Sequence, residues 1–122
     1  MFFVMLITLL PATAQQSGYQ PRAGDLLFQD LDCGPLCEAI EKVTTGYRGA
    51  HLSHVGILDK NNRGEWVVLE AISPQVKATP LDTFLARSLD ERGKPKVLAG
   101  RMKKPYRQLI PEVLQQVRAH IG

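Results

Sequence analysis

Short apolar runs separated by turn residues dominate the pattern along most of the chain. Each run has the length of a β-strand rather than that of a helix. The predicted strands cover residues 24–29, 53–58, 65–71, 75–79 and 96–102. The second and third runs are joined by "DKNNRG", which is rich in turn residues and predicts a β-hairpin.

Helical periodicity separates these runs at three places, covering residues 34–45, 81–88 and 111–122. Gly34 suits the N-cap of the first helix, and Pro35 suits its first turn. Apolar residues recur on one face of the first and last helices: Leu36, Ala39, Ile40 and Val43, then Val113, Leu114, Val117 and Ile121. The pattern predicts an α+β domain, a small and mostly antiparallel sheet packed with helices.

The first sixteen residues, "MFFVMLITLLPATAQQ", have a different character. Residues 2–10 are almost entirely apolar, and Pro11 and the small-residue triplet Ala12-Thr13-Ala14 follow. This order is typical of a secretory signal peptide over residues 1–14, and the run is too short to span a bilayer. We therefore expect a protein exported to the periplasm or the extracellular space, with no membrane span after signal removal and its folded domain over residues 24–122.

Length and charge limit the classes of partner. The chain has 122 residues, which is enough for one domain. Its net charge of +3 comes from 15 basic and 12 acidic residues spread along the sequence. Because no cluster of Lys and Arg is interleaved with aromatic residues, nucleic acid is not expected as a partner.

Two cysteines and two histidines have a spacing close to that of a zinc site. Cys33, Cys37, His51 and His54 form the pattern C-x3-C-x13-H-x2-H. If a strand begins by His51, however, an offset of three residues places the two histidines on opposite faces. The histidine spacing is also one residue shorter than usual. We therefore predict no metal site and no cofactor.

The cysteines allow three interpretations. In a secreted chain the pair can form a disulfide, and Cys33 lies just before the helix, where such a bond is feasible. Both can instead simply pack in the core. Alternatively Cys33 is a nucleophile, because the N-terminus of a helix lowers the pKa of a thiol. Disulfide formation and packing are the preferred interpretations.

His54 and Glu70 form a candidate catalytic pair. His54 begins one strand of the predicted hairpin and Glu70 ends the other, so an antiparallel pairing brings them close. If they share a face, Glu70 can accept the imidazole N–H and hold the tautomer that a general base needs. The spacing alone also fits a histidine at a strand start and an exposed glutamate at a strand end.

Three segments, "GDLLFQDLDCG", "GAHLSHVGIL" and "VVLEAISPQVKATPLDTFLARS", resemble the YiiX-like branch of the NlpC superfamily. These proteins are circularly permuted papain-like amidohydrolases. The resemblance implies a permuted papain-like α+β fold, with the catalytic histidine at His54 and its orienting partner at Glu70. Asp25 and Ser53 match further motif positions, which implies structural roles near the site, and we predict both as binding-site residues.

The sequence departs from this family at the nucleophile. Permuted members have their catalytic cysteine on a helix after the strands, whereas this sequence has no cysteine after Cys37. Three explanations remain: the sequence is part of a longer enzyme, it is a variant without a nucleophile, or Cys33 substitutes. We favour the first explanation, a domain truncated at its C-terminus.

The resulting hypothesis is a cysteine amidohydrolase or peptidase-like domain. The implied substrates are cell-wall peptides or N-acyl amines, with His54 as base and Glu70 as orienter. The alternative is a non-catalytic exported module that binds peptidoglycan or acyl-amine ligands.

Overall fold

One antiparallel sheet forms the centre of the molecule. The computed structural model describes residues 19–122, so the predicted signal peptide lies outside the described residues. Within them the strands are β1 (Leu26–Gln29), β2 (His54–Lys60), β3 (Trp66–Ile72), β4 (Gln75–Pro80) and β5 (Val97–Gly100). Their order in the sheet is β4-β3-β2-β1-β5, and every neighbouring pair is antiparallel.

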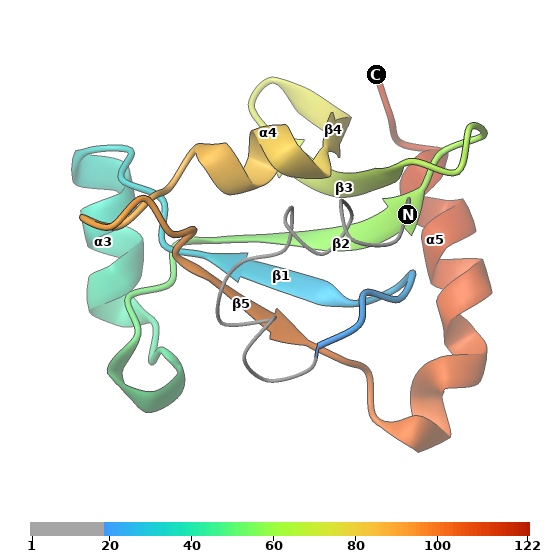
Figure 1. Ribbon diagram of the computed structural model, residues 1–122, viewed down its shortest axis with the longest axis horizontal. Coiled ribbons are helices and arrows are strands. Elements are labelled where there is room, and N and C mark those ends of the chain that lie inside the picture. The colour runs from blue at the N-terminus through green and yellow to red at the C-terminus, as the bar shows by residue number, and fades with distance from the viewer. Residues whose placement is uncertain (1–18) are drawn as a thin grey trace, which may run out of the picture.

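Helices occupy both faces and one end of this sheet (Figure 1). They are α3 (Pro35–Val43), α4 (Leu81–Ala86) and α5 (Ile110–Arg118), with short 3-10 turns η1 (Tyr47–Gly49) and η2 (Lys104–Leu109). Gly34 caps α3 with a φ of 75° and Pro35 occupies the first turn, as the sequence predicts. The predicted α+β class is confirmed. None of the helices in residues 19–122 has the length and apolar character needed to cross a membrane.

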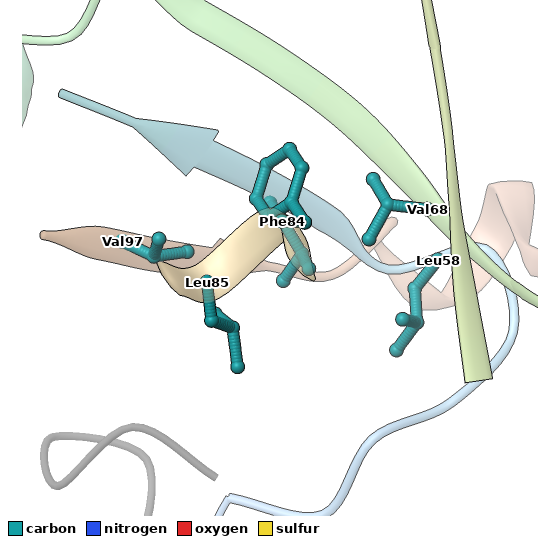
Figure 2. Packing of buried hydrophobic residues seen from close by; sticks show 6 residues of the cluster. Leu58, Val68, Phe84, Leu85 and Val97 are labelled. Atoms are coloured by element: carbon teal, nitrogen blue, oxygen red, sulfur yellow. The ribbon is translucent and has the colours of Figure 1, made fainter. Parts of the chain in front are cut away.

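The first face of the sheet holds the main core, beneath α4 (Figure 2). Phe84 of α4 is fully buried among side chains from four strands, because the register places alternate residues of β1, β2, β3 and β5 on this face. The buried cluster consists of Leu27, Leu58, Val68, Phe84, Leu85 and Val97. Packing of Phe84 therefore fixes the short helix α4 on the sheet.

The second face packs against α5. Leu114 is buried against Val67 and Leu69 of β3, with Ile57, Ile110 and Val117 around them. Arg118 also donates two hydrogen bonds to the buried Asp59 carboxylate, from Nε to Oδ2 and from Nη2 to Oδ1, both 2.6 Å long. The helix begins at Ile110 and ends at Arg118, earlier than the predicted end at residue 122.

The apolar face of α3 differs from its expected role. Leu36 is 67% exposed and Val43 is 83% exposed, so this stripe faces solvent within the described residues. Of the α3 side chains, that of Cys37 is buried. The sequence pattern predicted the helix correctly, but the cover that such a stripe normally receives is absent from residues 19–122.

Candidate active site

The hairpin brings His54 and Glu70 together on the first face of the sheet. Ile57 pairs with Leu69, so His54 and Glu70 lie diagonally across the β2–β3 ladder on the same face. The distance from His54 Nε2 to Glu70 Oε2 is 2.6 Å. The Glu70 side chain is fully buried and the His54 side chain is 14% exposed. The interpretation of Glu70 as an exposed strand-end residue is therefore wrong.

Gly56 makes this approach possible. It lies between His54 and Leu58 on β2, directly across from Glu70. A Cβ atom at this position would collide with Val68 Cγ1 and lie 3.5 Å from Glu70 Cβ. The glycine of the "SHVGIL" motif is thus required for close packing of the two strands beneath the histidine.

Two further side chains bind the Glu70 carboxylate. Thr79 of β4 donates its hydroxyl to Oε1 at 2.6 Å. Arg87, which follows α4, donates from Nη1 to Oε2 at 3.2 Å and from Nη2 to Oε1. Each carboxylate oxygen therefore has two donors, and a buried carboxylate with this many partners is held in one orientation.

These contacts keep Glu70 ionised. Burial raises the pKa of the Glu70 carboxyl, but the hydrogen bonds from His54, Arg87 and Thr79 outweigh it and lower the pKa to about 2. Because an ionised carboxylate only accepts hydrogen bonds, the proton between the two groups belongs to His54 Nε2. The neutral imidazole then carries its free lone pair on Nδ1, the position of a general base.

The surroundings of the imidazole are apolar on one side and polar on the other. The Phe84 ring lies 6.1 Å from the imidazole, between centroids. Gln29 is the Cα partner of His54 across β1 and β2, and its Nε2 donates to the Phe84 carbonyl at 2.7 Å. Among the described residues, Gln29 Oε1 is a buried side-chain oxygen without a hydrogen-bond partner.

Ser53 and Asp25 lie near opposite ends of β1: Ser53 beside Gln29, and Asp25 just before Leu26. Ser53 precedes His54, accepts from the Leu31 N–H and donates to the Leu31 carbonyl, both at 2.9 Å, which fastens the chain beside the imidazole. Asp25 lies four residues before Gln29, which is ~13 Å along the strand. The structure therefore brings Ser53 to the His54–Glu70 pair but does not bring Asp25 there.

Asp25 instead joins three segments at the far end of β1. It accepts hydrogen bonds from Tyr19 Oη at 2.5 Å, from the Arg22 N–H at 3.0 Å and from Arg101 Nε at 2.9 Å. Burial raises the pKa of Asp25, but the bonds from Arg101 and Tyr19 hold the pKa below its usual range. These contacts give Asp25 a structural role, and ligand binding by Asp25 and Ser53 stays a prediction.

Cys33 and Cys37 form a disulfide across the first turn of α3, with their Cα atoms 5.2 Å apart. In this state Cys33 has no thiol and cannot act as a nucleophile. His51 is exposed in the loop before β2, and its Nδ1 lies 4.0 Å from Glu41 Oε2. In the part of the chain that the structure describes, no group of three or more Cys, His, Asp or Glu side chains is arranged to hold a metal ion.

Sequence reasoning missed three residues that complete the site: Arg87, Thr79 and Gln29. Their positions depend on the order of the strands and on the placement of α4, and spacing along the chain does not show either. The register of β4 against β3, in which Thr79 pairs with Val68, places the Thr79 hydroxyl on the face of Glu70. The available signal for Thr79 was its position at the end of the fourth predicted strand, residues 75–79.

Comparison with known proteins identifies the family. No curated protein and no solved structure shows detectable similarity to the chain. One family model, described as permuted papain-like amidase enzyme, YaeF/YiiX, C92 family, matches residues 20–122. Amidases hydrolyse amide bonds, the chemistry for which a histidine base held by a carboxylate is suited. The chain therefore belongs to the YaeF/YiiX family of permuted papain-like amidases, as its resemblance predicted.

Proposed function

We propose that this domain carries the base and the orienter of a cysteine amidohydrolase. The observation that carries the proposal is the 2.6 Å contact of His54 Nε2 with a buried carboxylate that is held ionised. Within residues 19–122 no hydrogen-bonding group contacts Nδ1, and the imidazole is partly exposed. Nδ1 is thus the nitrogen that can receive a proton from an incoming thiol.

The proposed reaction is acyl transfer through sulfur. His54 Nδ1 takes the thiol proton, and the thiolate attacks the carbonyl carbon of the amide. The imidazolium returns the proton to the departing amine as the C–N bond breaks, which leaves a thioester. Water then attacks the thioester with His54 again as the base, and the products are a carboxylic acid and the free thiol. Glu70 stays ionised throughout and holds the imidazole.

The source of the thiol determines whether this sequence is active by itself. Its only two cysteines, Cys33 and Cys37, are bonded to each other. The thiol therefore comes either from reduction of this disulfide or from a cysteine outside the 122 residues. We favour the second source, and the oxidised chain is then inactive.

Substrate class and location follow from other features. The family chemistry and the apolar N-terminal run support an exported enzyme that acts on amide bonds of cell-wall peptides or N-acyl amines. The disulfide also supports export, because such bonds persist in oxidising compartments. The periplasm or the extracellular space is the proposed location.

Labelling with a thiol-reactive, amide-mimicking probe tests the proposal. The oxidised and the gently reduced protein are compared with the variants Cys33→Ala, Cys37→Ala and His54→Ala, and His51→Ala serves as the control for loss of a neighbouring histidine. Labelling of the reduced protein that needs both Cys33 and His54 would identify Cys33 as the nucleophile. Slow labelling with no dependence on His54 would show that His54 activates neither cysteine, and the thiol would have to come from elsewhere.

One observation favours a second function, ligand binding without catalysis. Neither of the two cysteines has a free thiol in the oxidised chain. A domain without a nucleophile can still use the site to bind peptidoglycan or acyl-amine ligands. Calorimetry with muropeptides and N-acyl amines tests this function. Binding without turnover, by a natural protein that has no further cysteine, would favour the module over the enzyme.

A further inference from the structure

The carboxylate of Glu70 has two oxygens and about four lone-pair positions. All four are used: Oε2 accepts from His54 and Arg87, and Oε1 accepts from Thr79 and Arg87. Arg87 contributes two of these four donors, and it is the group that contacts both oxygens. A guanidinium bound to both oxygens defines the plane of the carboxylate, whereas a single hydroxyl does not.

Arg87 is itself held in place by Phe84, through its backbone and through its side chain. Its backbone N–H caps α4 by donating to the Phe84 carbonyl at 3.4 Å. Its guanidinium lies over the Phe84 ring, 5.3 Å from the centroid, and the side chain is 25% exposed. Gln29 donates to the same Phe84 carbonyl, so β1 also fixes the end of the helix. The guanidinium of Arg87 is therefore already positioned before any ligand binds.

We propose that Arg87 is a positioning residue for the His54–Glu70 pair, which fixes the Glu70 carboxylate in the rotation that presents Oε2 to His54 Nε2. With Arg87 removed, two buried lone-pair positions lose their donors and the carboxylate can rotate about its last bond. The hydrogen bond that selects the Nε2–H tautomer then weakens, and Nδ1–H becomes more populated. The inference builds on the proposed base and orienter roles, but the tautomer itself is measurable without turnover.

The positive charge of Arg87, like its two hydrogen bonds, stabilises the ionised Glu70 carboxylate. Burial alone raises the pKa of Glu70, and the guanidinium helps to hold the pKa at about 2. A lysine in this position keeps the positive charge but cannot bond both oxygens in one plane. Lysine and alanine at this position therefore separate the effect of charge from the effect of the planar fork.

Nitrogen-15 NMR of the imidazole tests the proposal on the intact, disulfide-bonded chain. Spectra are recorded at alkaline pH for wild type, Arg87→Ala and Arg87→Lys. We expect wild type to be almost wholly the Nε2–H tautomer. The Nδ1–H fraction of His54 should rise roughly threefold or more in Arg87→Ala, and less in Arg87→Lys. The carbon-13 titration of the Glu70 carboxyl should move upward from about 2 in Arg87→Ala.

Arg118→Ala is the matched control. Arg118 makes the same kind of two-bond pair with a buried carboxylate, that of Asp59, but on the opposite face of the sheet. The Arg118→Ala change should lower the unfolding temperature without changing the His54 tautomer. An unchanged tautomer in a folded Arg87 variant would overturn the proposal, because Arg87 would then only anchor α4. If Arg87→Ala fails to fold, the Arg87→Lys spectrum decides between the same two outcomes. In a chain that contains the nucleophilic cysteine, labelling that is as fast in His54→Ala as in wild type would instead contradict the base role of His54 and leave the tautomer result standing.

Discussion

A buried carboxylate is unfavourable unless its lone pairs are filled, and at Glu70 they are filled by the groups that also shape the site. His54, Thr79 and Arg87 each contact this one side chain. The same bonds therefore stabilise the fold and orient the imidazole. Stability and site geometry should then change together when Glu70 is altered.

Glu70 should make the free energy of unfolding depend on pH in acid. Its pKa is lowered from 4.5 to about 2 in the folded chain, so the stabilisation is complete above the unfolded value and is lost as the pH falls through this interval. Glu70→Gln should therefore cost more stability at pH 6 than at pH 2.5, with a difference of roughly 2–3 kcal/mol. Urea unfolding of both proteins across this pH range measures the effect.

Glu112→Gln is the control for loss of a carboxylate, because Glu112 is exposed in the first turn of α5. Its stability should follow that of wild type within about 0.5 kcal/mol at every pH. A constant difference between wild type and Glu70→Gln from pH 6 to pH 2.5 would contradict the lowered pKa of Glu70.

The helices α3 and α5 show how one sequence pattern leads to two outcomes. Both are nine residues long and both carry an apolar stripe. The α5 stripe packs on β3 through Leu114, which is 4% exposed, whereas Leu36 of α3 is 67% exposed. Burial, and not the pattern, decides what each stripe contributes to stability.

Leucine-to-alanine changes in the two helices should therefore differ in cost. Leu114→Ala removes a buried side chain and leaves a cavity, and it should destabilise the protein by about 2–4 kcal/mol. Leu36→Ala changes a solvated side chain and should cost less than about 0.5 kcal/mol. Urea unfolding monitored by circular dichroism compares the two variants. Equal losses would contradict this expectation, because Leu36 would then be covered in solution.

At the scale of the whole molecule, apolar side chains gather at one end of the described structure. Leu36, Val43 and Tyr47 follow one another along α3 and η1 and are 67%, 83% and 63% exposed. α3 lies at the end of the sheet away from α5 (Figure 1). Large exposed apolar groups favour association, because their burial between molecules removes them from water.

We therefore expect the 122-residue chain to self-associate as its concentration rises. Sedimentation velocity over a concentration series measures this, and the double variant Leu36→Lys, Val43→Lys should sediment as a monomer. Leu89→Lys is the control, since Leu89 is 47% exposed and lies in a short β-bridge with Pro95. A monomer at every concentration in the unmodified chain would contradict the expectation.

Local signals in the sequence predicted most of the elements. The turn "DKNNRG", the apolar runs around it and the Gly34–Pro35 start of α3 depend on neighbours within a few residues, and the structure confirms them. The pairing of His54 with Glu70 was also predictable, because a hairpin register relates residues close in sequence. The exposure of the apolar stripe of α3 and the residue at which α5 ends were not predictable, because both depend on packing between segments far apart in the sequence.

The sequence by itself determined the α+β class, the hairpin and the family, because each follows from local hydrophobic periodicity or from motif residues. Tertiary structure alone decided which groups complete the site. Arg87 and Thr79 meet Glu70 because β4 lies beside β3 and because Phe84 anchors α4 over the sheet. Those contacts join elements that pack against a shared core. The spacing of residues along the sequence does not predict which distant elements pack together. The charge state and orientation of Glu70, and so the tautomer of His54, are therefore properties of the folded molecule.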